Sequence, residues 1–161
     1  MRWLAAAAAL ALVAAPAHGA QRVLFARGHW AALQSNDGRH CQAITRSLRD
    51  ATRGSEQARA AFAFDAMGER RGQLHVRLSR GVRDGSSVLL SIGDETFLLV
   101  ARGLFGWSVG PAQEAAMMVA ARRATGMRVE ARDGAGRRFI DHYLLAGAPS
   151  AIDAAAARCA S

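Results

Sequence analysis

The sequence contains no lysine, so all 21 of its Lys and Arg residues are arginine. This absence excludes hydrolases that rely on a Ser-x-x-Lys pair. Because alanine and glycine are also abundant, the arginine usage indicates a GC-rich coding bias rather than selection for guanidinium chemistry.

Long apolar runs are also missing, apart from one at the N-terminus. Arg2 supplies a positive charge, an apolar run extends from Leu4 to Ala15, and small residues suited to cleavage end at Gly19. The run falls short of the roughly 20 residues that a membrane span needs. We therefore predict a signal peptide over residues 1–19, cleaved after Gly19 or Ala20, and no transmembrane segment once it is removed. Residues 20–161 suffice for a single exported domain with one core.

The charge balance is strongly basic, with a formal net charge of +8 at pH 7. Such a balance favours anionic partners such as acidic lipid headgroups, lipopolysaccharide or glycans. Export argues against nucleic acid as the partner. Because the arginines are scattered and form no long basic run, a generally solvated basic surface is the alternative interpretation.

Cysteine is scarce as well, since Cys41 and Cys159 are the only two. Export predicts that they form a structural disulfide, because oxidising compartments join cysteine pairs. The alternative is a thiol nucleophile at Cys41, for which the candidate bases and orienting carboxylates are His40, His142, Asp141 and Asp153. Neighbouring residues on a strand point to opposite faces, so His40 is poorly placed to take a proton from Cys41.

Short alternating segments predict strands along most of the chain. Leu74, Val76 and Leu78 alternate with polar residues, which is typical of a half-buried antiparallel strand. Turn residues predict hairpins at residues 93–95 and 133–136. The predicted strands cover residues 28–34, 39–48, 59–68, 73–79, 88–92, 96–101, 127–132 and 137–145, with a further short strand at Trp107 and Val109.

Two segments have helical character instead. Pro111 can begin a helix over residues 111–125 that Gly126 ends. Ser150 is a suitable N-cap for a second helix over residues 150–159, and Asp153 is placed to complete a capping box. We therefore predict a mainly β fold, a single antiparallel β-sandwich-like domain with two appended α-helices.

An ordered set of features, from Trp30 and Cys41 to Cys159, resembles the invasion-associated locus B family of exported bacterial proteins. They include the segments VLLSIGDETFLLVARGLFGW, MMVAARRATGM and VEARDGAGRRFIDHYLLAGAPSAIDAAAARC. Leu144 stands where the family commonly has serine, and arginine replaces its usual lysine-rich surface. The resemblance implies a periplasmic or envelope β-sandwich-like protein linked to host-cell entry, with no catalytic constellation.

No motif points to a metal or another cofactor, and we expect neither. The candidate zinc ligands lack the short spacings of structural zinc sites, and they are His29, His40, Cys41, His75 and His142. We likewise expect no catalytic residues and no enzymatic activity.

One segment stands out as a contact surface. Glycines surround Trp107, and we expect residues Leu104, Phe105 and Trp107 to lie on an exposed loop. The leading hypothesis is an exported, non-enzymatic envelope protein that contacts an envelope or host macromolecule or an anionic surface. The alternative is a small-ligand or glycan-binding module with a pocket between the sheet and the helix over residues 111–125.

Overall fold

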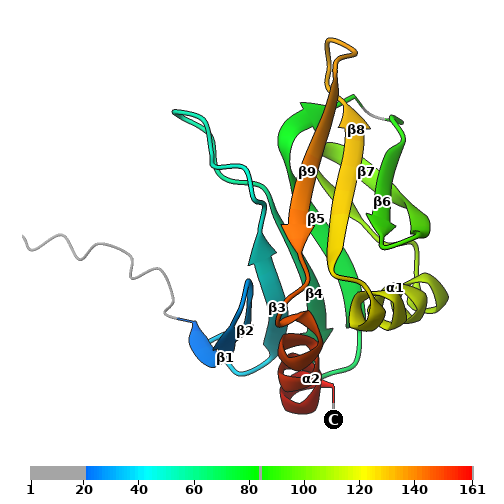
Figure 1. Cartoon of the computed structure of the whole chain (residues 1–161). Coiled ribbons are helices and arrows are strands. Elements are labelled where there is room, and N and C mark those ends of the chain that lie inside the picture. Colours follow the sequence, from blue (N-terminus) through cyan, green and yellow to red (C-terminus); the bar gives the residue numbers. More distant parts are fainter. Residues whose placement is uncertain (1–20, 84, 161) are drawn as a thin grey trace, which may run out of the picture.

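The computed structural model describes residues 21–83 and 85–160, which form nine β-strands and two α-helices (Figure 1). The predicted signal peptide lies outside the described residues. In chain order the elements are β1 (Arg22–Arg27), β2 (Trp30–Gln34), β3 (His40–Arg46), β4 (Arg59–Asp65), β5 (Arg71–Val82), β6 (Val88–Ile92), β7 (Glu95–Trp107), α1 (Pro111–Arg123), β8 (Gly126–Arg132), β9 (Arg138–Leu144) and α2 (Ala148–Cys159).

All the strands of the described residues join one antiparallel sheet in the order β1-β2-β3-β4-β5-β7-β6-β8-β9, which confirms the mainly β prediction. The long strand β7 joins two halves of this sheet. Its start pairs with β6 as far as Leu99, and its end pairs with β5 from Gly103 onward. Gly103 has a φ of +57°, which glycine adopts without strain, at the point where β7 changes partner.

The two halves of the sheet turn toward each other. The Ser79 backbone N–H of β5 donates to Asp141 Oδ2 of β9 at 2.9 Å, and the Leu48 N–H donates to the His142 carbonyl at 2.8 Å. Strands β5 and β9 are not neighbours in the sheet, so these contacts show that it curves back on itself. Leu78 and Val129 are fully buried in the shared core, which matches the predicted sandwich-like arrangement.

Both helices cover the sheet from the side of this core. Helix α2 contacts β1 through β5, whereas α1 contacts β5, β6, β7 and α2. Beneath α2, the rings of Trp30 and Phe62 stack with centroids 6.1 Å apart, and both side chains are buried. The Trp30 indole N–H donates to the Leu144 carbonyl at 2.9 Å, which satisfies its polar atom inside the core.

The N-terminus of α2 differs from the prediction. The helix begins at Ala148 rather than Ser150, with Pro149 in its first turn and Gly147 as the N-cap, so the predicted capping box is wrong. Gly147 has a φ of +95°, and a Cβ there would collide with the Arg27 carbonyl oxygen. Only glycine therefore lets the turn after β1 approach the start of α2. Neither helix of the described residues has the length and apolar character to cross a membrane.

Other element boundaries differ in smaller ways. Helix α1 ends at Arg123, and Gly126 begins strand β8 instead of ending the helix. Strand β1 was not predicted, because its sequence RVLFAR lacks the alternation of a half-buried strand and its residues are exposed or half-buried. Pairing with β2 along the edge of the sheet determines its conformation.

The predicted disulfide is present. Cys41 of β3 and Cys159 at the end of α2 form a bond across a sequence separation of 118 residues, with their Cα atoms 5.7 Å apart. Both residues are buried, and no cysteine remains free. The bond attaches the last turn of α2 to β3, a central strand of the first half of the sheet.

We predict that the double substitution Cys41→Ser and Cys159→Ser lowers the free energy of unfolding by about 2–5 kcal/mol, because the bond closes a long loop in the unfolded chain. Urea unfolding followed by tryptophan fluorescence measures the change. As a control, dithiothreitol should destabilise the wild type to the same level and leave the double variant unchanged. An unchanged unfolding midpoint in the variant would contradict the prediction.

Candidate binding face

A row of arginines crosses the face of the sheet that points away from α2. Arg46 of β3 lies opposite Arg59 of β4, which lies opposite Arg77 of β5, and Arg77 in turn lies opposite Phe105 of β7. Opposed residues of antiparallel strands share a face. Cys41 points to α2, so the even-numbered residues of β3, including Arg46, point away from it. We call Arg46, Arg59 and Arg77 the arginine row and the surface that carries them the open face.

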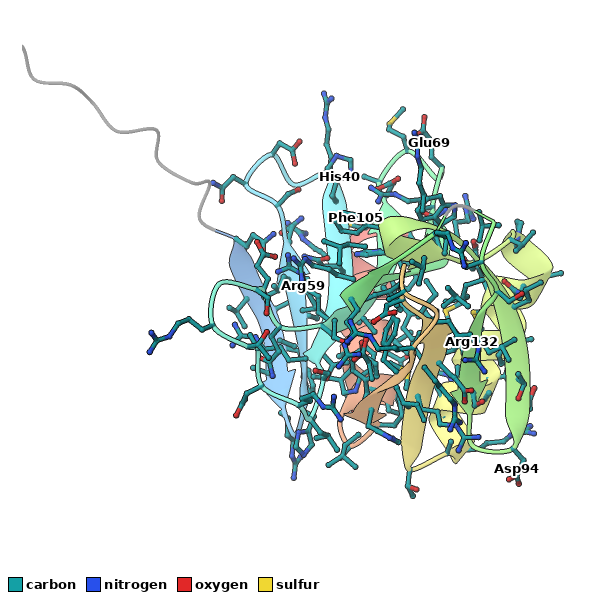
Figure 2. The ribbon with its side chains drawn as sticks, turned by 90° about the horizontal axis from the view of Figure 1, so that it is seen from above. His40, Arg59, Glu69, Asp94, Phe105 and Arg132 are labelled. Carbon is teal, nitrogen blue, oxygen red and sulfur yellow. A yellow bond between two sulfur atoms is a disulfide. The ribbon has the colours of Figure 1, made fainter. Side chains whose placement is uncertain are left out.

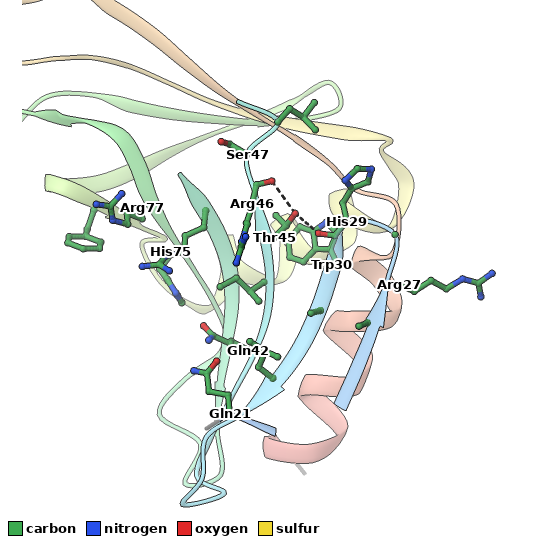
Figure 3. Close-up of a pocket in the computed structure, with 18 residues that line it drawn as sticks. Gln21, Arg27, His29, Trp30, Gln42, Thr45, Arg46, Ser47, His75 and Arg77 are labelled. Atoms are coloured by element: carbon green, nitrogen blue, oxygen red, sulfur yellow. Dashed lines mark hydrogen bonds between the residues drawn. The ribbon is translucent and has the colours of Figure 1, made fainter. Parts of the chain in front are cut away.

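A second line of residues lies beside the arginine row. Ile44, Ala61, His75 and Trp107 are opposed across β3, β4, β5 and β7. Side chains from both lines surround a depression of about 1010 Å³. Figure 3 shows His75 and Arg77 on one side of this depression and His29 on the other. The open face is therefore a hollow lined by arginine, histidine and apolar groups.

Glu56, from the loop between β3 and β4, pairs with two members of the arginine row. Its Oε2 atom lies 3.0 Å from Arg59 Nη2 and 3.0 Å from Arg77 Nε. Arg77 Nη1 also donates to the Glu56 backbone carbonyl at 2.9 Å. The Arg77 side chain is only 12% exposed, whereas the Glu56 side chain is 65% exposed. Within residues 21–83 and 85–160, Arg46 has no carboxylate partner.

His75 sits between these charges in the second line. Burial lowers the pKa of His75, and the positive charges of Arg70 and Arg59 lower it further. The imidazole is therefore neutral near pH 7 and can donate one hydrogen bond and accept another. Protonation below neutral pH would add a further positive charge to the open face.

The structure separates the three residues of the predicted contact surface. Leu104, Phe105 and Trp107 belong to strand β7, not to an exposed loop, so the loop prediction is wrong. Phe105 and Trp107 share the open face, but Leu104 points to the opposite side because side chains alternate along a strand. Phe105 is 52% exposed and Trp107 is half-buried. Figure 2 labels Arg59 of the arginine row and Phe105, which lies opposite Arg77 at the end of that row.

The interface between α1 and the sheet is packed. Met117, Ala120 and Ala121 of α1 are buried, and Glu114 accepts a hydrogen bond from the Ser108 hydroxyl at 2.8 Å. The depression of about 1010 Å³ is lined by residues of the first half of the sheet, its loops and Phe105. The hollow therefore lies on the open face and not beside residues 111–125, where the sequence suggested a ligand pocket.

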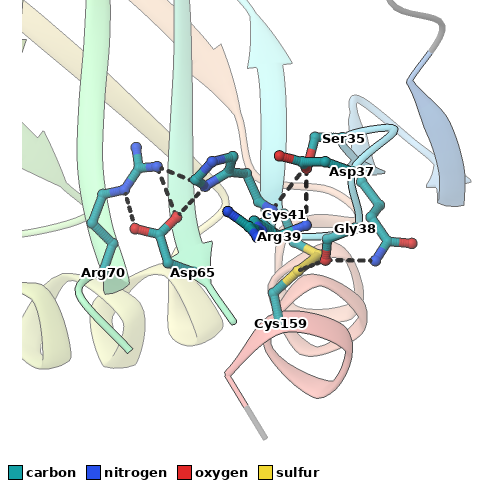
Figure 4. A network of polar contacts seen from close by, with 10 residues as sticks. Ser35, Asp37, Gly38, Arg39, Cys41, Asp65, Arg70 and Cys159 are labelled. Atoms are coloured by element: carbon teal, nitrogen blue, oxygen red, sulfur yellow. Dashed lines mark hydrogen bonds and ion pairs between the residues drawn. A yellow bond between two sulfur atoms is a disulfide. The ribbon is translucent and has the colours of Figure 1, made fainter. Parts of the chain in front are cut away.

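A polar cluster lies at the other end of β3, next to the disulfide (Figure 4). Arg70 donates from Nε to Asp65 Oδ2 and from Nη2 to Asp65 Oδ1, each at 2.7 Å, and His40 Nδ1 lies 2.7 Å from Asp65 Oδ1. The hydrogen bonds from Arg70 lower the pKa of Asp65, and the contact with His40 lowers it further. Asp65 is buried, so the cluster joins β3, β4 and the turn after β4 through charged hydrogen bonds.

The structure contradicts the thiol alternative, because Cys41 is bonded to Cys159 and no thiol remains. Asp141, one proposed orienting carboxylate, is buried and bonded to the Ser79 N–H. Asp153, the other, pairs with Arg122. In the part of the chain that the structure describes, no three His, Cys, Asp or Glu side chains gather closely enough to hold a metal ion.

The comparisons with known proteins give one solved structure of similar fold. No family model matches the chain, and no curated protein sequence matches it. The crystal structure of invasion associated protein B from Bartonella henselae is similar over 83% of this chain and 95% of that one, with a TM-score of 0.61 and 15% sequence identity. The two chains share a fold. At this identity the similarity carries no information about shared binding residues.

The arginine row could not be located in the sequence by a motif. Arg46, Arg59 and Arg77 are 13 or more positions apart, and each is the polar member of an alternating strand. The alternation of polar and apolar residues does predict which side of its own strand each arginine occupies. The register that aligns the three strands depends on tertiary contacts.

We predict that Asp65→Asn destabilises the protein near neutral pH and that its difference from the wild type shrinks in acid. Because the pKa of Asp65 is lowered in the folded state, its stabilising effect is complete above the ordinary aspartate pKa of 3.8 and is lost as the pH falls through the lower pKa of the folded protein. Urea unfolding at several pH values between about 6 and 2.5 measures this difference. Asp94→Asn, in an exposed hairpin, is the control. A constant difference between wild type and Asp65→Asn would refute the assignment.

Proposed function

We propose that the protein is an exported, non-enzymatic component of the cell envelope that acts by contact with an anionic macromolecule through the open face. The arginine row is the observation that carries this proposal. Three guanidinium groups on adjacent strands concentrate positive charge beside an exposed phenylalanine. Guanidinium groups bind carboxylate and phosphate oxygens in paired geometry, and aromatic residues add contact area.

The charge of the whole chain supports the same partner class. Its net charge of +8 at pH 7 favours approach of an anionic surface at long range, while the arginine row supplies a defined place for contact. The hollow is open to solvent on the side away from α2, so a large partner can reach it. A non-enzymatic role is supported by the state of the cysteines, which are held in a disulfide and offer no nucleophile.

Export has three independent supports. The N-terminal sequence has the order of charge, apolar run and small residues of a signal peptide. The disulfide requires an oxidising environment to persist. The similar solved structure is of an invasion associated protein from a bacterium, and the same setting is proposed for this chain. The partner would then be a component of the envelope or of a host surface.

We predict that the full chain expressed in a Gram-negative host appears in the periplasmic fraction without its first 19 or 20 residues. Intact-mass measurement identifies the cleavage site, and mass spectrometry without reduction should find no free thiol. A control chain with Leu10→Arg and Leu12→Arg, which interrupts the apolar run, should remain uncleaved in the cytoplasm. Uncleaved wild-type protein in the cytoplasm would contradict export.

We predict that Arg46→Gln combined with Arg59→Gln weakens retention on purified envelope fragments by about tenfold, because charged hydrogen bonds to the partner are lost. Co-sedimentation at low salt measures retention. Arg77 is left unchanged because its buried side chain is bonded to the Glu56 backbone.

The matched control combines Arg123→Gln with Arg128→Gln, two exposed arginines on α1 and β8 that are outside the open face. It makes the same change in net charge and should bind like the wild type. Equal loss in both double variants would indicate binding by overall charge, and no loss in either would exclude the open face as the contact surface.

A further inference from the structure

We propose that Arg59 and Arg77 form a carboxylate site for an acidic saccharide, and that Glu56 occupies this site as an internal competitor until the saccharide displaces it. The inference rests on the proposed function and names the partner class of the same face. The partner is a chain of sugars that carry carboxylate groups, such as uronic acid residues. Its carboxylate would take the position of the Glu56 Oε2 atom between the two guanidinium groups.

The geometry of Glu56 shows that the pair binds a carboxylate oxygen. One oxygen atom, Oε2, lies 3.0 Å from a nitrogen of Arg59 and 3.0 Å from a nitrogen of Arg77. A single acceptor held by two guanidinium groups from neighbouring strands is a charge-assisted contact of the kind that also recognises ligand anions. The site is therefore already shaped for one carboxylate oxygen.

The two sides of this contact differ in how firmly they are held. Arg77 is 12% exposed, and its Nη1 donates to the Glu56 backbone carbonyl, so the guanidinium keeps its position when the carboxylate leaves. The Glu56 carboxylate is 65% exposed, and exposed ion pairs contribute little to stability. Displacement therefore costs little, and the arginine that receives the ligand is pre-ordered.

The loop that carries Glu56 is attached at its base and exposed at its tip. Gln57 Nε2 donates to the Ser47 carbonyl at 2.9 Å and to the Arg49 carbonyl at 3.3 Å. Residues 49–56 are exposed to solvent. The Glu56 side chain can thus turn away from the arginine row while Gln57 still holds the end of the loop.

The surroundings of the site favour a saccharide over other anions. Phe105 stands at the end of the row with half of its surface exposed, and it offers a flat apolar face to a sugar ring. His75 and Gln42 line the hollow and can exchange hydrogen bonds with hydroxyl groups. Arg46 supplies a further cation without a carboxylate partner in residues 21–83 and 85–160.

The shape of the open face fits a sugar chain better than it fits a flat membrane surface. Neighbouring strands lie about 4.8 Å apart, close to the repeat of a sugar residue in an extended chain. A sugar chain lying across β3, β4, β5 and β7 therefore advances by about one residue at each strand. The hollow of about 1010 Å³ recedes from a planar bilayer but accepts a chain laid into it.

Glu56→Gln is the direct test, with a linear oligogalacturonate as the probe and isothermal titration calorimetry at low salt as the measurement. Removing the competing charge should tighten binding about two- to fivefold, which corresponds to an exposed ion pair. Glu56→Ala should show the same gain, since neither change removes the backbone carbonyl that holds Arg77. Glu95→Gln makes the same charge change in an exposed hairpin outside the open face and should bind like the wild type.

The outcomes separate the inference from the proposed function. Equal or weaker binding by both Glu56 variants, compared with Glu95→Gln, would overturn the role of Glu56. Absence of oligogalacturonate binding, or tighter binding to phosphatidylglycerol vesicles or to a thymidine oligonucleotide, would overturn the saccharide assignment. Both results leave the proposed function standing if envelope retention still requires Arg46 and Arg59. If retention is also insensitive to those arginines, the proposed function itself fails.

Discussion

The packing of α2 against the first half of the sheet is the constraint on which the other features depend. The Cys41–Cys159 bond attaches the end of the helix to β3, and the Gly147 approach to Arg27 brings its start against the turn after β1. Because side chains alternate along a strand, covering one face of β2 through β5 leaves the other face open. The position of α2 therefore determines which residues can meet a partner.

The open face combines arginines held on paired strands with one glutamate side chain on a loop. Strand pairing aligns Arg46, Arg59 and Arg77, while Glu56 reaches Arg59 and Arg77 from a loop. Strands change their register only by breaking many hydrogen bonds, whereas a loop side chain moves at little cost. The arrangement gathers guanidinium groups and hydrogen-bonding side chains around one hollow, which suits recognition of an anion.

Sequence reasoning succeeded where one local pattern decides the structure. The alternation of Leu74, Val76 and Leu78 predicted a half-buried strand, and all three are buried in β5. Sequence reasoning failed where contacts between distant segments of the chain determine the local structure. Ser150 satisfies the local rules for an N-cap, but the approach of Gly147 to β1 lets α2 begin earlier. The glycines suggested an exposed loop around Phe105 and only a short, separate strand at Trp107, yet pairing with β5 makes both residues part of the long strand β7.

The sequence by itself determined the mainly β class, the position of most strands, the cysteine pair and the basic charge, because these follow from composition and local periodicity. Only the tertiary structure decided the strand order, with β7 between β5 and β6, and the register that aligns three arginines with Phe105. Register depends on which faces are buried together across the whole sheet. The arginine row and its contact with Glu56 therefore exist only in the folded chain.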